Sequence, residues 1–301
     1  MSKSNSYNPL VSIITLCYNQ ENYIYKCLDS VINQTYQNWE MVIVDDFSTD
    51  GTIKVINLFK DSRIKLLLNE KNNGPEGLGN SYNKALQNCN GELIAILEGD
   101  DYWPLEKLEK QIKFHDNNDI VLSWGQMQKV GINKPKQRKY NDRKLSFKPL
   151  LSDLLVANMI PAVTVMIKKI NLENVGGFWQ PEGAVLVDHP TWIKLSLEGK
   201  FLYIPELLGI YRIHEKQISM NYAEKMLISS VNYVNYFLSE VSEEISAKLD
   251  FKKIKASQKL KIANLNYITN NRMKAIEDYI NVIYSGRLSQ KIDAIRALFR
   301  I

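Results

Sequence analysis

Short apolar runs alternate with segments of helical spacing along the first 125 residues, and this alternation constrains the fold more than any other feature of the chain. The runs are rich in branched side chains, as is typical of buried strands. They cover residues 11–16, 41–44, 64–68, 93–97 and 120–124. The segments between them repeat apolar residues at helical intervals, with Ile24, Leu28 and Val31 in the first. Alternating strands and helices predict a parallel sheet with helices on both faces.

Polar and acidic residues follow the first four predicted strands. Ligands of an open parallel sheet bind beyond the carboxyl ends of its strands, so these residues are expected to converge on one crevice. They are Tyr18 and Asn19, Asp45 and Asp46, the turn at 69–77, and the acids Glu98, Asp100 and Asp101.

The turn after the first strand, LCYNQENY at residues 16–23, contains no glycine. A glycine-rich loop at this place usually holds the phosphates of a nucleotide, so the dinucleotide-binding interpretation weakens. If the crevice binds a nucleotide diphosphate, its negative charge must be offset in another way. A divalent metal held by one or two carboxylates is the usual solution, and Asp100 and Asp101 can provide it. The alternative is structural, because glycine and aspartate also favour an ordinary turn. Asp50 can likewise merely cap the next helix.

The ordered motifs of residues 9–219 resemble those of inverting glycosyltransferases of family 2, which have the GT-A fold. The motifs are VSIITLCYNQENYIYKCLDSVINQTYQNWEMVIVDDFSTDGT, NGELIAILEGDDYW, GGF, a late aspartate and YRIHEKQIS. The resemblance implies an α/β fold with a Rossmann-like, mostly parallel central sheet flanked by helices, and a C-terminal helical extension. It also implies a nucleotide-sugar-binding half at 1–125, an acceptor-binding half at 126–220 and a helical region at 221–301.

The resemblance assigns roles to the acidic residues and to a histidine. Asp46 would recognise the base or ribose of the nucleotide, with Asp45 as a supporting neighbour. Asp100 and Asp101 match the acidic pair that binds the metal and the donor diphosphate. Asp101 would contact the Mn²⁺ or Mg²⁺ ion that bridges the diphosphate, and His214 would lie near that metal.

Further residues complete the implied site. Arg212 would add positive charge at the diphosphate, and Tyr18, Asn19 and Glu21 lie where the family contacts the base. Asp188 in VLVDHP matches the general base, which removes the proton of the acceptor hydroxyl as its oxygen attacks the anomeric carbon. Inversion at that carbon is implied by the family and by the single candidate base.

The sequence departs from the family pattern in three places. Glu98 stands where many relatives have aspartate, Val187 replaces the acid that usually precedes the base, and residues 74–86 lack an arginine that many relatives offer to the nucleotide. His214 can instead be an interior histidine, and Tyr18 a packing residue. Candidates for stacking on a sugar ring, or for plain packing, are Trp103, Trp179 and Trp192.

The sequence therefore predicts a metal-dependent transfer of a sugar from a nucleotide sugar, a UDP-sugar by preference, to a hydroxyl of a glycan or lipid-linked acceptor. One alternative is a nucleotidyltransferase that makes nucleotide sugars, which normally has the glycine-rich loop that is missing here. Another is a sugar- or nucleotide-binding module without catalysis. The presence of the candidate catalytic and binding residues argues against a loss of catalysis. These residues are Asp46, Asp100, Asp101, Asp188 and His214.

The composition is that of an ordinary globular protein, with 45% hydrophobic and 24% charged residues among 301. No apolar run reaches the ~18 to 20 residues that span a bilayer. The polar start MSKSNSYNPL has no signal-peptide core, so a cytoplasmic location is expected. Cys17, Cys27 and Cys89 lack CxxC spacing and are expected to be buried thiols.

Positive charge is concentrated at the C-terminal end of a chain whose net charge is +5. From Phe251 onward, eleven lysines and arginines stand against three acids. We expect these helices to pack on the catalytic domain or to form a homodimer, with a basic face at the inner surface of an anionic membrane. A solvated helix face is the alternative, and we expect no nucleic-acid partner. The basic stretch 131–144 is expected to be a mobile loop, either an acceptor lid or disordered.

Overall fold

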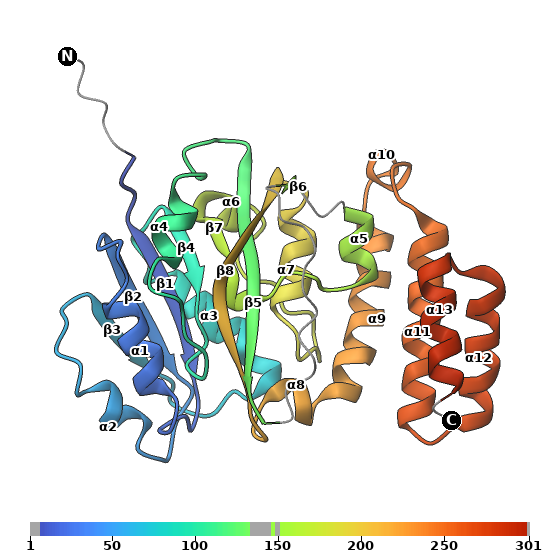
Figure 1. The fold of residues 1–301 in the computed structure, drawn as a ribbon, viewed down its shortest axis with the longest axis horizontal. Helices are drawn as coiled ribbons and strands as arrows, with labels where there is room; N and C mark the ends of the chain where they lie inside the picture. Colours follow the sequence, from blue (N-terminus) through green and yellow to red (C-terminus); the bar gives the residue numbers. More distant parts are fainter. Residues whose placement is uncertain (1–6, 133–145, 148–150, 300–301) are drawn as a thin grey trace. The chain divides into compact units, whose positions relative to one another are not determined.

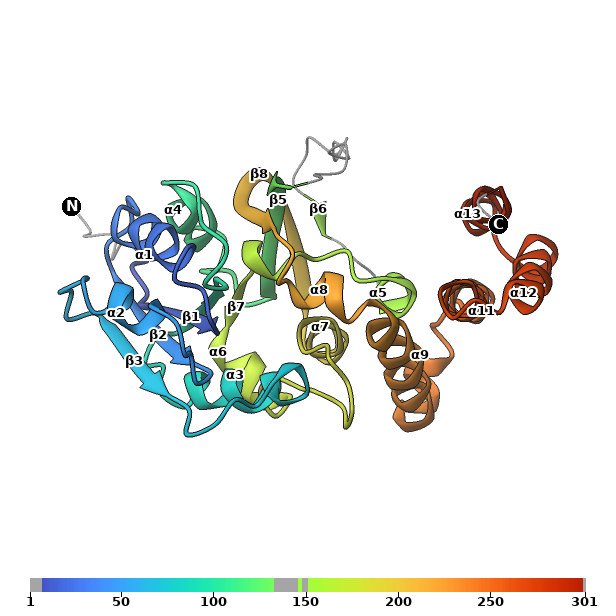
Figure 2. The same cartoon turned by 90° about the horizontal axis from the view of Figure 1, so that it is seen from below.

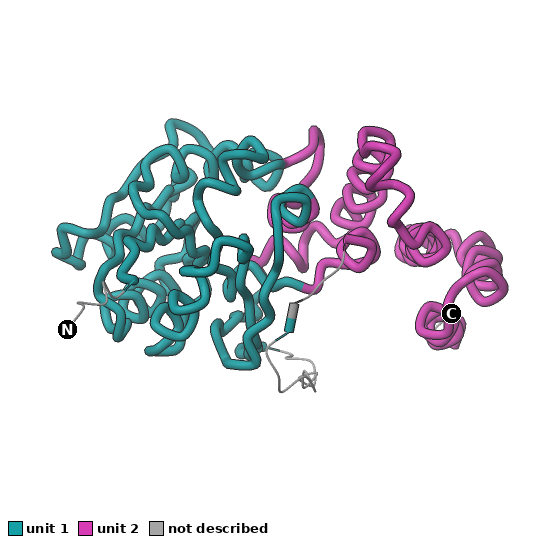
Figure 3. The backbone as a smooth tube through the Cα atoms, turned by 90° about the horizontal axis from the view of Figure 1, so that it is seen from above, with its two compact units in different colours: residues 1–148, 160–179, 194–215 teal, residues 149–159, 180–193, 216–301 magenta. Residues whose placement is uncertain are grey.

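The structure is a computed structural model of the 301-residue chain, and it describes residues 7–132, 146–147 and 151–299. The chain divides into two compact units, coloured teal and magenta in Figure 3. Unit 1 comprises residues 1–148, 160–179 and 194–215, and unit 2 comprises residues 149–159, 180–193 and 216–301. Segments distant in the sequence therefore build each unit. The basic loop expected at 131–144 falls almost entirely outside the described residues.

Unit 1 is built on a sheet with the strand order β3-β2-β1-β4-β7-β5-β8-β6 (Figure 1). Strands β3, β2, β1 and β4 are parallel neighbours, and β5 is parallel to β8. Strand β7 runs antiparallel to β4 and β5, and β6 runs antiparallel to β8. The predicted mostly parallel sheet is confirmed. Its strands are β1 (Val11–Cys17), β2 (Trp39–Asp45), β3 (Ile64–Leu68), β4 (Leu93–Ile96), β5 (Ile120–Gly131), β6 (Ser146–Phe147), β7 (Met166–Lys168) and β8 (Lys200–Ile213).

Helices cover both faces of this sheet, with α1 and α4 on one face and α3 and α6 on the other (Figure 2). Alternate residues of β1 and β2 pack with α1 and α4 in one buried cluster, because successive side chains of a strand point to opposite faces. The helices and 3₁₀ turns are α1 (Ile24–Ile32), α2 (Thr52–Ile56), η1 (Pro75–Gly77), α3 (Leu78–Leu86), α4 (Lys107–Ile112), η2 (Ala162–Thr164) and α6 (Lys169–Asn174).

Three features of unit 1 differ from the sequence prediction. Strand β3 has the predicted bounds but is only partly buried, because it is the outermost strand of the sheet. Residues 162–167 (AVTVMI) have the branched, apolar composition of a strand, yet they begin as the 3₁₀ turn η2, and only β7 pairs in the sheet. Strand β8 was not predicted, since it contains Pro205 and mixes polar and apolar residues without regular alternation. It pairs with β5 across bulges, which a sequence pattern does not indicate.

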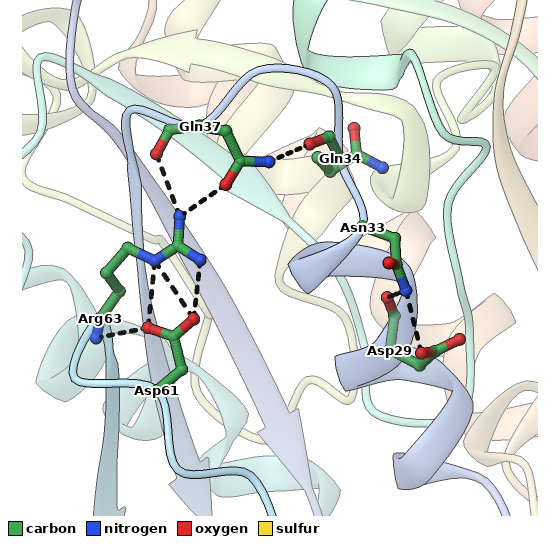
Figure 4. A network of polar contacts seen from close by, with 6 residues as sticks. All are labelled: Asp29, Asn33, Gln34, Gln37, Asp61 and Arg63. Atoms are coloured by element: carbon green, nitrogen blue, oxygen red, sulfur yellow. Dashed lines mark hydrogen bonds and ion pairs between the residues drawn. The ribbon is translucent and has the colours of Figure 1, made fainter.

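A polar network closes the loops at the amino ends of β2 and β3 (Figure 4). The Arg63 guanidinium donates to both carboxylate oxygens of Asp61 and to the backbone and side-chain oxygens of Gln37. It also lies over the Trp39 ring, 3.6 Å from the centroid. Gln37 in turn donates to the carbonyl of Gln34. These contacts join the loops that precede β2 and β3.

Unit 2 is helical. Its C-terminal helices enclose a small core in which Ala263, Ala275, Tyr279, Val282 and Ala294 are buried. No helix in the described part of the chain is long and apolar enough to cross a membrane. The helices are α5 (Leu151–Val156), the first residues of α7 (Asp188–Leu195), α8 (Ile218–Asn221), α9 (Ala223–Glu240), α10 (Glu243–Ser246), α11 (Phe251–Ile268), α12 (Arg272–Ser285) and α13 (Leu288–Leu298).

Candidate active site

The residues after β1 are tied to the turn that follows β2. The side-chain oxygen of Asn19 accepts a hydrogen bond from the backbone N–H of Thr49 at 2.8 Å. The carboxylate of Glu21 accepts one from the N–H of Gly51 at 2.7 Å. Tyr18, the third residue predicted to contact the base, is 47% exposed. Asn19 and Glu21 therefore shape this turn, whereas Tyr18 leaves its ring available.

Asp45 is buried and supports the same turn. Its carboxylate accepts hydrogen bonds from the backbone N–H of Ser48 at 2.8 Å and from the Ser48 hydroxyl at 2.5 Å. Between them, Phe47 has a φ of 70°, a left-handed conformation that is rare for a bulky residue. Strained backbone of this kind clusters at functional sites. Phe47 is half exposed, and sequence reasoning missed it because only the backbone angle distinguishes it.

Asp46 holds the turn after β3. Its carboxylate accepts hydrogen bonds from the side chain of Asn69 at 2.8 Å and from the side chain of Asn73 at 3.0 Å. The backbone N–H groups of Asn73 and Gly74 also donate to it, at 3.1 and 3.2 Å. Gly74 has a φ of 63°, which glycine adopts without strain. Asp46 therefore connects the carboxyl ends of two neighbouring strands, and its predicted contact with a nucleotide stays a prediction.

The acidic turn after β4 approaches β1 closely at Gly99. The Gly99 N–H donates to the carbonyl of Leu16 at 3.1 Å. A Cβ atom at position 99 would lie 2.2 Å from the side-chain oxygen of Gln20 and 3.0 Å from the Cβ of Cys17. Only glycine fits this approach without displacing its neighbours, so the glycine of EGDD sets the distance between the acids and the end of β1.

Strand β8 pins the acidic turn from the other side. Tyr102 and Ile210 exchange backbone hydrogen bonds of 3.2 and 2.9 Å. Two residues further along, the N–H of Arg212 donates to the Asp101 carboxylate at 2.8 Å. Asp101 is only 1% exposed, and burial, together with the nearby charge of Asp100, raises the pKa of its carboxyl well above the ordinary value. Asp101 is thus an internal acceptor that joins the turn to β8.

Asp100, in contrast, faces His214. Its carboxylate lies 2.8 Å from His214 Nε2. The His214 ring stacks on Tyr23 with the ring centroids 4.6 Å apart, and the Arg212 guanidinium lies 4.9 Å from the centroid of the same Tyr23 ring. Asp100, Arg212 and His214 therefore lie close together around Tyr23 and the acidic turn, and their predicted roles at a metal and diphosphate stay predictions. Tyr23 was missed, because an aromatic residue at a helix start carries no sequence signal of its own.

The donors at this position fit a hard divalent cation. Carboxylate and imidazole are both ligands for Mn²⁺, and Mg²⁺ is commonly held by one or two carboxylates with substrate phosphates and waters. Adjacent ligands of an octahedral ion with bonds of about 2.1 Å lie about 3 Å apart, close to the 2.8 Å between Asp100 and His214. The described residues include no cluster of three or more His, Cys, Asp or Glu suited to a metal. A cation here would need oxygen ligands from a diphosphate.

The tryptophans considered for sugar stacking are mostly structural. Trp103 is 3% exposed and its indole N–H donates to the carbonyl of Val163 at 2.7 Å. The buried ammonium of Lys107 lies 4.1 Å from the centroid of that ring and donates to the carbonyl of Val165, the residue before β7. Trp192 is fully buried. Only Trp179, which has Lys194 over its ring at 4.4 Å, retains an accessible surface.

Asp188 belongs to unit 2, where it is the first residue of α7. Its carboxylate accepts a hydrogen bond from the side-chain amide of Asn158 at 2.7 Å. Burial raises the pKa of Asp188 above the ordinary value, and the hydrogen bonds from the His189 backbone and from Asn158 partly oppose this rise. A carboxylate with a raised pKa is a better proton acceptor at neutral pH, which is the property a general base needs. Asn158 was missed because it is thirty residues away in the sequence.

His189, directly after Asp188, fixes the first turn of α7. Its Nε2–H donates to the carbonyl of Leu154 on α5 at 2.7 Å. Its Nδ1 accepts a hydrogen bond from the Tyr233 hydroxyl on α9. Burial lowers the pKa of His189 to about 3, so the ring is neutral, as this pair of bonds requires. One side chain therefore joins three helices of unit 2 next to the candidate base.

A separate cavity of about 450 Å³ lies near the amino end of β4. Its lining includes Tyr7, Glu92, His115 and Lys168 and none of the residues predicted for the donor site. The acidic turn and this cavity belong to opposite ends of β4, so the cavity is not part of the candidate active site.

The mostly parallel sheet, the acidic turn after β4 and the strand β8 that leads to His214 define a glycosyltransferase of the GT-A class. The chain belongs to glycosyltransferase family 2, since the model of "Glycosyl transferase family 2" matches residues 12–174. The predictions of the family, of the fold and of a glycosyltransferase are confirmed. Neither the nucleotidyltransferase nor the binding-module alternative agrees with this result.

Two relatives and one solved structure illustrate the likeness. The chain is 33% identical over 228 residues to TuaG of Bacillus subtilis, named as a teichuronic acid biosynthesis glycosyltransferase, with 72% of this chain and 84% of TuaG covered. It is 39% identical over 144 residues to the Escherichia coli UDP-Glc:alpha-D-GlcNAc-diphosphoundecaprenol beta-1,3-glucosyltransferase WfgD, covering 48% of this chain and 56% of WfgD. The structure of S. aureus TarS 1-349 with UDP-GlcNAc superimposes with a TM-score of 0.71 at 18% identity, over 91% of this chain and 81% of that one.

Proposed function

We propose that the protein transfers a sugar from a UDP-sugar, with a divalent metal and with inversion, to a hydroxyl of a lipid-linked glycan acceptor in cell-envelope polysaccharide synthesis. The observation that carries the donor part is the pairing of Asp100 with His214 at the carboxyl end of the sheet. WfgD is named for a UDP-sugar donor and a diphosphoundecaprenol acceptor, and TuaG for teichuronic acid synthesis, which supports the donor and acceptor classes.

Asp100 and His214 are the residues proposed to hold the metal. Asp101 is proposed to keep the acidic turn in place as a buried hydrogen-bond acceptor. This differs from the sequence prediction, which put Asp101 on the metal. The burial of Asp101 and its bond from the Arg212 N–H favour the change. When bound, the cation would neutralise charge on the diphosphate and so stabilise the leaving group. Arg212 would add a second positive charge on the same side.

Tyr18, Asn19, Glu21 and Asp46 are proposed to surround the base and ribose. Their side chains frame the turns after β1, β2 and β3, which is where ligands of a parallel sheet bind. The half-exposed ring of Phe47 extends the proposal, because an aromatic ring can stack on a nucleobase.

Asp188 is proposed as the general base. Its carboxylate would take the proton of the acceptor hydroxyl while that oxygen bonds to the anomeric carbon. The bond from this carbon to the donor diphosphate breaks with its electron pair on the diphosphate. Attack opposite the departing group inverts the anomeric configuration, and no covalent sugar–enzyme intermediate is needed.

The proposed acceptor also implies where the enzyme works. A polyprenyl diphosphate acceptor is anchored in a membrane, so the enzyme would work at the inner face of that membrane as a peripheral protein. The excess of lysine and arginine from Phe251 onward supports contact with anionic lipid.

Thermal denaturation of the full chain with UDP, GDP and several UDP-hexoses, with and without Mn²⁺ or Mg²⁺, tests the donor site. A ligand that binds only the folded state raises the melting temperature with its concentration. We expect a metal-dependent rise with UDP that is larger than with GDP. A rise of the same size without metal would contradict the metal proposal, and a preference for GDP would contradict the donor proposal. Product analysis with a synthetic polyprenyl-diphosphate-linked sugar then tests the acceptor.

A further inference from the structure

Helix α13 (Leu288–Leu298) carries its larger apolar side chains on the outside. Leu288, Ile292, Ile295 and Phe299 are 74%, 39%, 42% and 87% exposed. They recur at intervals of four, three and four residues, which places them on one face of the helix. This face is a row of large hydrocarbon groups in contact with solvent.

The opposite face of α13 is built from mostly smaller or polar residues. Ala294 is fully buried, and Ala297 and Leu298 pack against the core of the C-terminal helices. Gln290 is buried too, and its amide donates to the carbonyl of Lys253 on α11 at 2.7 Å. An amphipathic helix that only completed a core would bury its largest apolar side chains and expose the polar ones. In α13 only Leu298 among the large apolar side chains packs against this core and the others are exposed, so its outer face is adapted to a second apolar environment.

Helix α12 has an exposed apolar row of its own. Met273, Ile280 and Tyr284 are 80%, 42% and 82% exposed, and their spacing of seven and four residues places them on one face as well. Ala275, Tyr279 and Val282 fill the core beneath. The exposed residues of the two helices, Met273, Ile280, Tyr284, Leu288, Ile292, Ile295 and Phe299, are called the α12–α13 surface below.

Basic side chains accompany the outer face of α13. By the rotation of an α-helix, Lys291 and Arg296 flank the exposed row on its two sides. Asp293 lies further round the helix, and its carboxylate is 3.7 Å from the Arg296 guanidinium. In a symmetric dimer formed through this face, the flanking cations of one copy would approach those of the other. An anionic lipid surface offers the opposite charge to the cations and hydrocarbon to the apolar row.

We infer that the α12–α13 surface inserts into the interfacial layer of an anionic membrane, with Leu288, Ile292, Ile295 and Phe299 as the inserted row. The inference deepens the proposed membrane contact and rests on it, but it assigns the contact to apolar side chains of one helix rather than to basic charge alone. The long basic side chains remain at the level of the lipid head groups.

Sedimentation of the full chain with vesicles tests the inference, using phosphatidylglycerol and phosphatidylcholine at 1:1 and phosphatidylcholine alone. The variant L288Q/I292Q/F299Q replaces exposed residues by a good helix former, so the fold should persist, and circular dichroism verifies this. We expect its partition onto the anionic vesicles to fall by at least about tenfold, since removing hydrocarbon burial weakens interfacial binding. The matched control is L58Q/L105Q in unit 1, where the exposed leucines are 68% and 56% accessible; it should bind as the unaltered protein does.

The possible results distinguish the proposed membrane contact from the proposed insertion of the apolar row. If the unaltered protein binds neither vesicle, the proposed membrane contact itself is wrong. If it binds and the triple variant binds equally, while K291Q/R296Q loses binding, the contact is electrostatic and the insertion is wrong. If neither protein binds vesicles, and the unaltered protein is a dimer in solution whereas the triple variant is a monomer, the surface joins two copies of the chain and the insertion is wrong. A tenfold loss of partition onto the anionic vesicles in the triple variant, with the L58Q/L105Q control unchanged, supports insertion.

Discussion

The two acidic sites of this enzyme are held in place by different kinds of contact. In unit 1, the turn with Asp100 and Asp101 is fixed by backbone groups, since Gly99 bonds to β1 and the Arg212 N–H bonds to Asp101. In unit 2, Asp188 is held by a side chain, Asn158, and its helix is held by another, His189.

This difference predicts different sensitivities to mutation. A backbone donor survives substitution of its own side chain, so the acidic turn should tolerate changes at Arg212 without losing its shape. A side-chain donor disappears with its residue, so the surroundings of Asp188 can be altered one bond at a time. The pKa of Asp188 should therefore be the most adjustable property of the site.

The largest effect is expected for Asp188→Asn. Asparagine keeps the shape of the side chain and an oxygen that can accept from Asn158, but it cannot take a proton at neutral pH. The transfer rate should fall about 10²- to 10⁴-fold, while the thermal shift caused by UDP and Mn²⁺ stays unchanged. Asp153→Asn, a carboxylate on α5 of the same unit that pairs with Lys253, is the control and should retain its rate. Full activity of Asp188→Asn would remove this residue from the role of base.

The next comparison separates Asp100 from Asp101. Asp100→Ala should weaken the metal-dependent binding of UDP about 10- to 100-fold, by analogy with other losses at metal sites, with little change in unfolding free energy. Asp101→Ala should instead lower the unfolding free energy by about 1–3 kcal/mol, because the Arg212 N–H loses its buried acceptor. Urea unfolding and titration with UDP and Mn²⁺ give both quantities. A stable Asp101→Ala protein that has lost its metal dependence would restore the original assignment.

A smaller effect is expected at Asn158. Its hydrogen bond lowers the pKa of Asp188, so Asn158→Ala should raise that pKa further above the ordinary value. The base acts as a carboxylate, so kcat/KM falls as the pH drops through this pKa, and the acidic limb of the profile should move to higher pH in the variant. Asn266→Ala removes an equivalent amide-to-carboxylate bond, to Asp278 at 2.8 Å, and should leave the limb in place. An unmoved limb in Asn158→Ala would mean that another group controls the profile.

The smallest difference concerns two of the buried histidines, His115 in unit 1 and His189 in unit 2. Burial lowers the pKa of His115 and of His189 to about 3, below the value in the unfolded chain. The unfolded chain therefore takes up protons first, and each histidine should cost about 2 kcal/mol of unfolding free energy between pH 8 and pH 5. In His189→Gln and in His115→Gln, the decrease of the unfolding free energy between pH 8 and pH 5 should be smaller by the contribution of the replaced histidine. Urea unfolding at both pH values measures it, and an unchanged pH dependence in both variants would refute this account.

Part of the fold was readable from local patterns. The parallel strands β1, β2 and β4 are indicated by apolar runs, because strands buried on both faces need apolar side chains at nearly every position. Strand β3 is also an apolar run, although it is only partly buried. Strand β8 gave no such signal, since its residues face a mixture of environments and it contains Pro205. Yet β8 is the strand that holds the acidic turn and carries the chain to His214. The site is thus completed by an element that sequence periodicity does not indicate.

The sequence by itself determined which chemistry the chain can perform. Ordered motifs place Asp46, Asp100, Asp188 and His214 at the ends or starts of elements, and element order decides which strand ends face a ligand. Tertiary structure alone decided how adjacent acids differ, because Asp100 and Asp101 are equal in sequence but only Asp101 is buried against a backbone donor. It also decided the partners of Asp188 and the outward direction of the apolar row on α13. Burial and hydrogen bonding depend on residues distant in the sequence, and no local pattern encodes them.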